Sequence, residues 1–356
     1  MQNNGRGRSS SLGRLWGKLW NSPLPTLGCE ISHSGVSLAR WSWNSAGLDT
    51  AAWKPIPAGA VEASPLRENI QQPEEVRKAF AEAMASLGIS PAADSSKRPH
   101  EVVLVIPDQA ARLFVLNFDT FPQRSSQGLP LVKWRLKKSV PFDVETAAIS
   151  YFVQRSAAEL QVVAVATPQS IVRKYEAIPE SFGLRPRWVS LSTLASLGLA
   201  GDFKENLPPA VRTGGPASSA EGSLGEQAGR VGVLVAKYSP PWFTTAILQA
   251  GTLRLFRTVG LSAGEDGSPS RADALAAIYP SMAYFQDNFQ GAITRGYLCG
   301  LGESSDSIAA ALEREPHLET NPLVLNTNGL RSGFDAVRAE QYFAALLGVA
   351  QEQRNG

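Results

Sequence analysis

VGVLVAKYSPPWFTTAILQAGTLRLFRTVG, residues 231–260, predicts three consecutive strands, because Ser-Pro-Pro and Ala-Gly turns divide its apolar and β-branched runs. The stretch LGCEISHSGVSLARWSW, residues 27–43, predicts a similar hairpin with its turn at Ser-His-Ser-Gly. Helix-like and strand-like runs follow each hairpin. The sequence therefore predicts an α/β protein of two related halves, each of which opens with a hairpin.

Changes in composition divide the chain into further segments. We expect residues 1–26 to be a flexible tail with a short amphipathic helix and residues 201–229, rich in Gly, Pro, Ser and Ala, to be a linker or loop. Residues 27–200 form the first half, with an inserted strand-helix unit at about 102–153. Residues 230–350 form the second half.

The expected helices are recognised by apolar periodicity and by their stop signals. Residues 73–88 end at a glycine, and a short basic helix at 131–140 ends at Pro141. Proline is expected to break the last turn of a helix at 170–182 and to interrupt a helix at 271–289. A last helix is predicted at 335–350.

Composition excludes several classes of protein. With 356 residues and 43% hydrophobic content the chain can bury a large core, and a net charge of +2 provides no field that would gather nucleic acid. Cys29 and Cys299 lie in apolar runs and are predicted to be buried, reduced thiols, as in a cytoplasmic protein. No apolar stretch approaches the roughly 18 residues of a membrane span or resembles a signal peptide, so we expect neither export nor membrane insertion.

One segment of the tail has the pattern of a membrane-surface helix. In SSLGRLWGKLWNSPLP the basic residues Arg14 and Lys18 project from one face, and the opposite face carries Leu12, Leu15, Trp16, Leu19 and Trp20. Three outcomes stay open for this segment. It lies on a lipid surface, packs on the protein's own body, or stays disordered.

Several blocks, taken in order, resemble a known family. They are CEISHSGVSLA, SVPFDVETAAISYFVQ, VVAVATPQSIVRKYEAIPESFGLRPRWVSLSTLA, FRTVGL and YLCGLGE. Together they resemble the PilM family of actin-like proteins of type IV pilus machines, whose counterpart is the cytoplasmic part of the type II secretion protein GspL. The resemblance covers about residues 27–350. It implies a two-lobed actin-like ATPase fold, related to RNase H, in which each lobe is a mixed sheet with helices.

The resemblance also implies a function. PilM-like proteins lie at the inner face of the cytoplasmic membrane, bind the cytoplasmic tail of a PilN-like bitopic membrane protein and contact the pilus assembly platform; some carry bound ATP. We therefore expect a cytoplasmic, peripheral scaffold of a type IV pilus or type II secretion assembly. Two alternatives stay open: an active ATPase or sugar-kinase-like enzyme, and an independent membrane-surface adaptor.

The two phosphate loops depart from the family pattern. A lysine is expected where this chain has Ser37, and the Asp-x-Gly of the second loop falls on Ala236, Lys237 and Tyr238. A metal-binding carboxylate and a close-approach glycine are therefore replaced. We expect no catalytic or metal-binding residue, and either no ATP or weakly bound ATP. The remaining contacts of this degenerate site are Ser32, His33, Ser34, Lys237, Gly300 and Gly302.

Three other candidates each have a simpler interpretation. His33 has the chemistry of a general base, but no nucleophile is fixed beside it, which favours a turn histidine. Asp108 has the chemistry of a catalytic acid, but Pro-Asp between strands is first of all a turn signal. The run KWRLKK, residues 133–138, could bind phosphates, but it is interpreted as a solvated basic helix or as a partner contact.

The partner's tail is expected where the inserted unit meets the first lobe. An exposed strand edge with flanking apolar side chains binds an extended peptide through backbone pairing and side-chain pockets. The predicted walls of this groove are Leu113, Val115, Trp134 and Phe142. The same residues could also be ordinary core.

Overall fold

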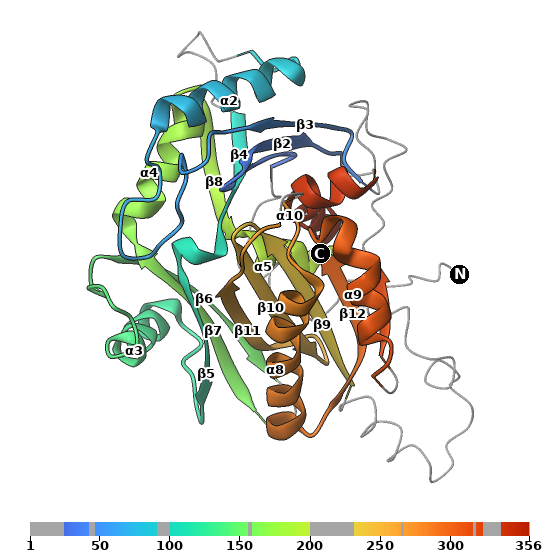
Figure 1. Ribbon diagram of the computed structural model, residues 1–356. Helices are drawn as coiled ribbons and strands as arrows, with labels where there is room; N and C mark the ends of the chain where they lie inside the picture. Colours follow the sequence, from blue (N-terminus) through green and yellow to red (C-terminus); the bar gives the residue numbers. More distant parts are fainter. Residues whose placement is uncertain are drawn as a thin grey trace, which may run out of the picture.

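The computed structural model describes residues 25–42, 47–90, 100–155, 159–199, 231–264, 267–315, 318–322 and 336–355. Within these residues the chain builds two five-stranded sheets and one three-stranded sheet (Figure 1). The predicted membrane-surface helix and the predicted linker lie outside the described residues. None of the described helices is long and apolar enough to cross a membrane.

The first lobe is a mixed sheet with the strand order β3-β2-β1-β4-β8. An antiparallel hairpin pairs β1 with β2, β3 continues the antiparallel series, and β4 and β8 add parallel strands on the other side. The strands are β1 (Leu27–Ile31), β2 (Gly35–Arg40), β3 (Thr50–Pro55), β4 (His100–Ile106) and β8 (Leu184–Leu191). The first predicted hairpin is thus confirmed.

The second lobe repeats this topology with the order β11-β10-β9-β12-β13. Three antiparallel strands follow one another and two parallel strands complete the sheet. They are β9 (Val231–Ser239), β10 (Trp242–Gln249), β11 (Thr252–Gly260), β12 (Ala292–Cys299) and β13 (Glu319–Pro322). Because both sheets have the same order and strand directions, the prediction of two related halves is confirmed.

Helices cover the sheets according to the alternation of side chains along each strand. On one face of the first sheet, Leu104 and Ile106 pack against α2 (Pro73–Ser86) and α4 (Gln169–Glu180). On the other face, Val103 and Val105 pack against α10 (Ala336–Asn355). The second sheet is covered by α8 (Arg271–Phe289) and α9 (Ser305–Leu312). Cys29 and Cys299 are buried free thiols, as predicted, and burial raises the pKa of both.

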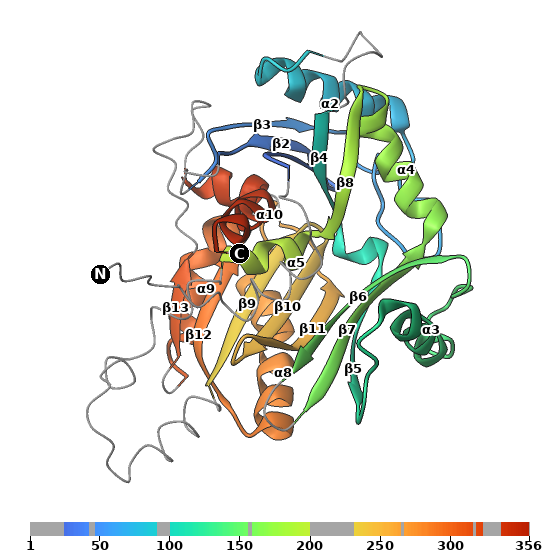
Figure 2. The ribbon, with the colours of Figure 1, turned by 180° about the vertical axis from the view of Figure 1, so that it is seen from behind.

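The helix α10 belongs to the core of the first lobe, although residues 230–350 were predicted to form the second. It crosses α5 (Ser192–Ser196) between the two sheets (Figure 2). A Cβ atom on Gly198 would lie 2.1 Å from the carbonyl oxygen of Gly348, and one on Gly348 would lie 2.1 Å from that of Ala195. The backbones can approach this closely only because both positions are glycine.

The inserted unit is a three-stranded sheet with the order β5-β7-β6 and one helix. Its elements are β5 (Arg112–Phe118), α3 (Ser125–Leu136), β6 (Ala147–Arg155) and β7 (Leu160–Pro168). The unit therefore runs from Arg112 to Pro168 instead of the predicted 102–153. The difference has a simple cause: β4 is a buried strand between β1 and β8, and an apolar run does not show which sheet it joins.

Two helix predictions need correction at prolines. The basic helix begins six residues before the predicted 131–140 and ends at Leu136, because it accommodates Pro130 internally. The helix α8 continues through Pro280, which was expected to interrupt it. Arg257 donates a hydrogen bond of 3.0 Å to the carbonyl oxygen of Ala277, three residues before this proline. The carbonyl that loses its partner at Pro280 is the neighbouring one, of Ala276, because a helical N–H bonds to the carbonyl four residues earlier.

Candidate functional site

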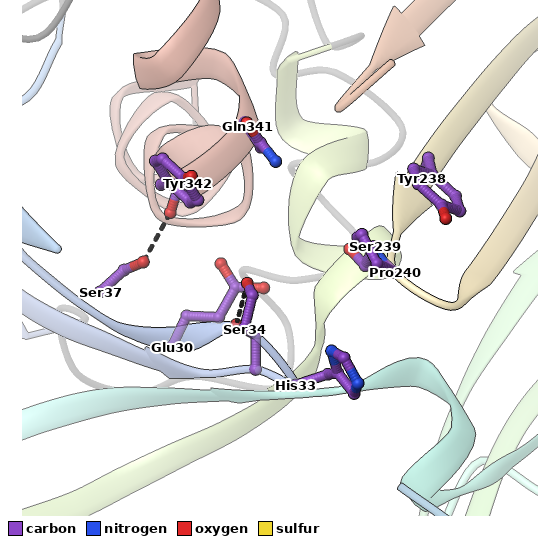
Figure 3. A pocket seen from close by; sticks show the side chains of 10 residues that line it. Glu30, His33, Ser34, Ser37, Tyr238, Ser239, Pro240, Gln341 and Tyr342 are labelled. Atoms are coloured by element: carbon purple, nitrogen blue, oxygen red, sulfur yellow. Dashed lines mark hydrogen bonds between the residues drawn. The ribbon is translucent and has the colours of Figure 1, made fainter. Parts of the chain in front are cut away.

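The turns of the two hairpins face each other across a small pocket (Figure 3). The space that the centre of a water-sized sphere can reach is about 20 Å³, and about 10–15 Å³ of such space holds one water molecule. The enclosed part of the pocket therefore has room for one or two waters, and the rest is open to solvent. Its lining residues are Glu30, Ser32, His33, Ser34, Ser37, Tyr238, Ser239, Pro240, Gln341 and Tyr342. The predicted contacts Ser32, His33 and Ser34 are thus brought together at this pocket, whereas Lys237, Gly300 and Gly302 do not line it.

The first turn is closed by its own hydrogen bonds. The backbone N–H of Ser32 donates to the carbonyl oxygen of Gly35 at 2.9 Å, and the Gly35 N–H donates to the Ser32 hydroxyl at 3.2 Å. These two amides therefore do not point at the pocket. His33 is half-buried, and burial lowers its pKa, partly opposed by Glu62. Its Nδ1 is buried without a hydrogen-bond partner among the described residues, which fits a turn histidine without a nucleophile.

Lys237, from the second lobe, is buried behind the pocket and is held by side chains of the first lobe. It ends the row Val233, Val235, Lys237 on the face of β9 that is directed toward the first lobe. Its Nζ donates to the hydroxyls of Ser192 at 2.6 Å and Ser196 at 2.9 Å, and lies 4.0 Å from Oε1 of Glu30.

Glu30 and Ser192 complete this contact from the first lobe. Glu30 is only 6% exposed and accepts a hydrogen bond from the Ser192 hydroxyl. A buried ion pair is tolerated when further hydrogen bonds satisfy both charges, and Lys237 and Glu30 fulfil this condition together. We call the group Glu30, Ser192, Ser196 and Lys237 the inter-lobe cluster. It joins β1, α5 and β9.

Asp108 makes a second polar contact between the lobes. It lies in a short 3₁₀ turn after β4, and its carboxylate accepts from the backbone N–H of Thr193 at 2.9 Å and from the hydroxyl of Thr193. It also accepts from the hydroxyl of Thr244 on β10 at 2.9 Å. A carboxylate at the first turn of α5 satisfies an otherwise unpaired helix amide. Asp108 is thus both a turn residue, as interpreted from the sequence, and a tie between lobes.

The inserted sheet contacts the second lobe through an amide side chain. Gln154 donates to the carbonyl oxygen of Leu253 at 2.7 Å and accepts from the Leu253 N–H at 3.0 Å. Beside it, Arg254 pairs with Glu159 and donates to Gln161 at 3.0 Å. The Gln154 side chain therefore pairs with the backbone of β11 as another strand would.

Glu340 on α10 contacts the segment that contains Gly300 and Gly302 in the second lobe. Its Oε1 accepts a hydrogen bond of 2.8 Å from the backbone N–H of Gly300, which has a φ of +69°. Burial raises the pKa of Glu340 to about 7, opposed by this hydrogen bond and by Lys237. A Cβ at Gly300 would lie 2.2 Å from the carbonyl oxygen of Tyr238, so only glycine fits.

The residues that replace the family's loop positions have structural contacts. The Ser37 hydroxyl donates to the carbonyl oxygen of Tyr342 at 2.7 Å and so joins β2 to α10. Tyr238 is 1% exposed and packs in the core of the second lobe, and Figure 3 shows its ring turned away from Glu30. In the part of the chain that the structure describes, no three His, Cys, Asp or Glu residues gather as metal ligands.

The four predicted walls of the peptide groove do not lie together. Leu113 and Val115 are half-buried on the face of the inserted sheet that packs against the main core. Phe142 packs on the opposite face, near α3, and Trp134 is exposed. Phe152 shares the face of Leu113 and Val115. Sequence reasoning missed it, because the pairing of β6 with β7 decides which face it occupies.

Sequence reasoning also missed Ser192, Ser196 and Glu340. Ser192 begins α5, and Glu340 lies near the start of α10, far along the chain from their partners. Serine at the start of a helix carries a capping signal only. The contacts of Ser192, Ser196 and Glu340 depend on how the two lobes pack together, and no pattern in the neighbouring sequence predicts that packing.

Comparison with known proteins gives a match of fold. No family model matches the sequence, and no curated protein matches it. A chain of the PilM-PilN type IV pilus biogenesis complex is similar with a TM-score of 0.65 and 18% sequence identity, covering 94% of this chain and 99% of that chain. At this identity the likeness concerns the fold.

Two weaker structural matches were also found. The cytoplasmic domain of EpsL, an inner membrane component of the type II secretion system of Vibrio cholerae, has a TM-score of 0.45 and 12% identity, covering 92% of this chain and 93% of that one. A Bacteroides thetaiotaomicron protein with an actin-like ATPase fold has a TM-score of 0.43 and 10% identity, covering 92% and 96%. The chain has the two-lobed actin-like fold, and its resemblance to PilM is confirmed at the level of the fold.

Replacing Lys237 by Met is expected to lower the free energy of unfolding by about 3–5 kcal/mol, because it leaves the Glu30 carboxylate buried without its cation. Urea unfolding followed by circular dichroism measures this loss. The exposed Lys78→Met serves as control and should change stability by less than about 0.5 kcal/mol. Adding Glu30→Gln to Lys237→Met should recover part of the lost stability. If the double variant instead loses as much stability as the two single variants together, the pairing is contradicted.

Replacing Glu340 by Gln should stabilise the protein at pH 8. The folded pKa of about 7 exceeds the ordinary value of 4.5, so the protonated form is favoured by folding. The group's stabilising contribution is therefore complete below pH 4.5 and is lost as the pH rises through 7. At pH 8 the variant should gain up to about 3 kcal/mol over wild type. Equal gains at pH 4.5 and pH 8 would contradict this explanation.

Proposed function

We propose that this protein is a cytoplasmic scaffold of a type IV pilus or type II secretion-like assembly, and that it binds the cytoplasmic tail of a PilN-like bitopic membrane protein. It would then act at the inner face of the cytoplasmic membrane as a link to the assembly platform. The observation that carries the proposal is the shared fold with a chain of the PilM-PilN complex over nearly the whole of both chains. The fold alone does not specify a function. The cleft between the lobes and the inner face of the inserted sheet give the proposal further support.

The cleft between the lobes supports a scaffold in preference to an enzyme. In an actin-like ATPase a nucleotide would lie between the hairpin turns, held by free backbone amides. Here two amides of the first turn bond within the turn, and Glu340 accepts the hydrogen bond of the Gly300 N–H. The Ser192 hydroxyl connects Lys237 to Glu30 in the inter-lobe cluster. These contacts disfavour the alternative of an active ATPase or sugar-kinase-like enzyme.

The surface that suits an extended peptide is the inner face of the inserted sheet. Leu113, Val115 and Phe152 line this face and are only half-buried, although they pack against the main core. Among the described residues β5 pairs with β7 alone, so its other edge is not paired with a strand. A peptide can add to such an edge through backbone hydrogen bonds while its side chains contact the apolar residues beside it.

This placement refines the groove predicted from sequence. Leu113 and Val115 remain as walls, and Phe152 joins them. Trp134 and Phe142 are left out, because they belong to the side of the sheet that α3 covers. The inner face of this sheet therefore supplies the test variants, and the side of α3 supplies an apolar control, Trp134.

No ATPase turnover is expected, and isothermal calorimetry with Mg-ATP should show at most weak binding, with no requirement for Mg²⁺. Micromolar affinity needs about 8 kcal/mol net, whereas Glu340 already accepts the hydrogen bond of the Gly300 N–H and two amides of the first turn bond within that turn. Nucleotide that stays bound through purification with sub-micromolar affinity would contradict this prediction and would revive the enzyme alternative.

Leu113→Asn and Phe152→Ala, made separately, should each weaken binding of a PilN-like tail peptide at least about fivefold, since each removes an apolar contact worth about 1–3 kcal/mol. Fluorescence anisotropy of the labelled peptide measures the affinity. Trp134→Ala is the matched control and should bind as wild type does.

Thermal melting must first show that each variant still unfolds cooperatively. Unchanged affinity in both folded variants, or a loss confined to Trp134→Ala, would move the peptide away from the inner face of the inserted sheet. If wild type binds no tail peptide from any candidate partner, the scaffold proposal itself fails.

A further inference from the structure

The outer side of α3 carries the most exposed large hydrophobic side chain among the described residues. Trp134 is 68% exposed, and no aromatic contact involves it in that part of the chain. The inner side of the helix is fixed to the inserted sheet through Gly128, Val132 and Leu136. Trp134 lies midway between Val132 and Leu136 in sequence, so helical geometry directs it away from the sheet.

Basic residues lie along and at both ends of the helix that carries this tryptophan. The fifteen residues 124–138 contain no Asp or Glu, and their basic residues are Arg124, Lys133, Arg135, Lys137 and Lys138. Lys133 pairs with Glu145 at 3.0 Å, and the Arg135 guanidinium lies over the ring of Phe118. Arg124, Lys137 and Lys138 are exposed and form no ion pair with another described residue. With a net charge of only +2 for the whole chain, this concentration is local.

We propose that the outer face of α3, which exposes Trp134 and is flanked by Arg124 at one end and Lys137 and Lys138 at the other, docks on a bilayer of anionic phospholipid. Basic side chains are attracted to the negative surface, and an indole ring is stable at the depth of the head groups. The helix lies at the periphery of the molecule in both views (Figures 1 and 2). A protruding helix of this kind suits a flat surface, whereas an acidic peptide would need a groove.

This inference does not depend on the peptide site. Leu113, Val115 and Phe152 lie on the face of the inserted sheet opposite to α3. Binding of a tail peptide there leaves the outer face of α3 free. A substitution in one surface should therefore leave the other unchanged, and failure of either proposal can be recognised separately.

The test is co-sedimentation of the full chain with phosphatidylcholine vesicles that contain or lack phosphatidylglycerol. Because lipid binding is one of the outcomes left open for residues 12–20, each variant is also made in a Trp16→Ala, Trp20→Ala background. In that background the protein should still bind the anionic vesicles. Lys137→Gln with Lys138→Gln should lower the partition coefficient roughly 25-fold, about fivefold for each basic residue. Trp134→Ala should lower it several-fold, and binding to neutral vesicles should be weak throughout.

Two controls keep the result specific. Lys78→Gln with Arg314→Gln removes the same charge from exposed positions of α2 and of the segment after α9, and should bind as the parent does. The Trp134 variant should also bind the tail peptide normally. The proposal is overturned if the background protein ignores anionic vesicles, if the α3 variants bind as their parent does, or if the control pair lowers binding equally.

Discussion

The contact between Lys237 and Glu30 is the constraint around which the two lobes are arranged. A buried lysine and a buried glutamate are each costly, and each is acceptable here only because the other lobe supplies its partner. The hydroxyls of Ser192 and Ser196 satisfy the remaining hydrogen bonds of the ammonium group. Asp108 and Gln154 add ties at other points of the same interface. The lobes are thus joined by the chain's own side chains at the place where the fold offers room for a ligand.

Much of the fold could be predicted from local patterns. Apolar runs divided by short polar or proline-containing turns predicted the two hairpins, and the repetition of this pattern indicated two related halves. Val103 and Val105 show where this reasoning stops: their burial was predictable, but the sheet and the helix that cover them were not. Similarly, Pro280 was expected to interrupt α8, but the helix continues through it to Phe289.

The candidate site was less predictable than the fold. Ala236 and Tyr238 stand where the resemblance to PilM predicts phosphate-loop residues, and this was visible in the sequence. The contacts that these positions make in the structure were not. The new contacts join groups that are far apart in sequence, such as Ser192 with Lys237 and Gly300 with Glu340. Propensity and periodicity describe neighbours along one element, whereas these pairs depend on the packing of whole lobes. Trp134 was predicted wrongly for a different reason. An apolar residue in a helix was expected to face a core or a groove, but this side chain is exposed.

The close crossing of α5 and α10 has a consequence for how the molecule is made. Trp41, Val103 and Trp188 form one core with α10, which follows the entire second lobe in the chain. During synthesis from the N-terminus, the first lobe therefore reaches the ribosome exit long before the helix that covers this face of its sheet. Its aromatic residues stay uncovered until the second lobe has emerged, and two glycines then let the late helix seat directly against α5. The lobe that is translated first is thus completed last.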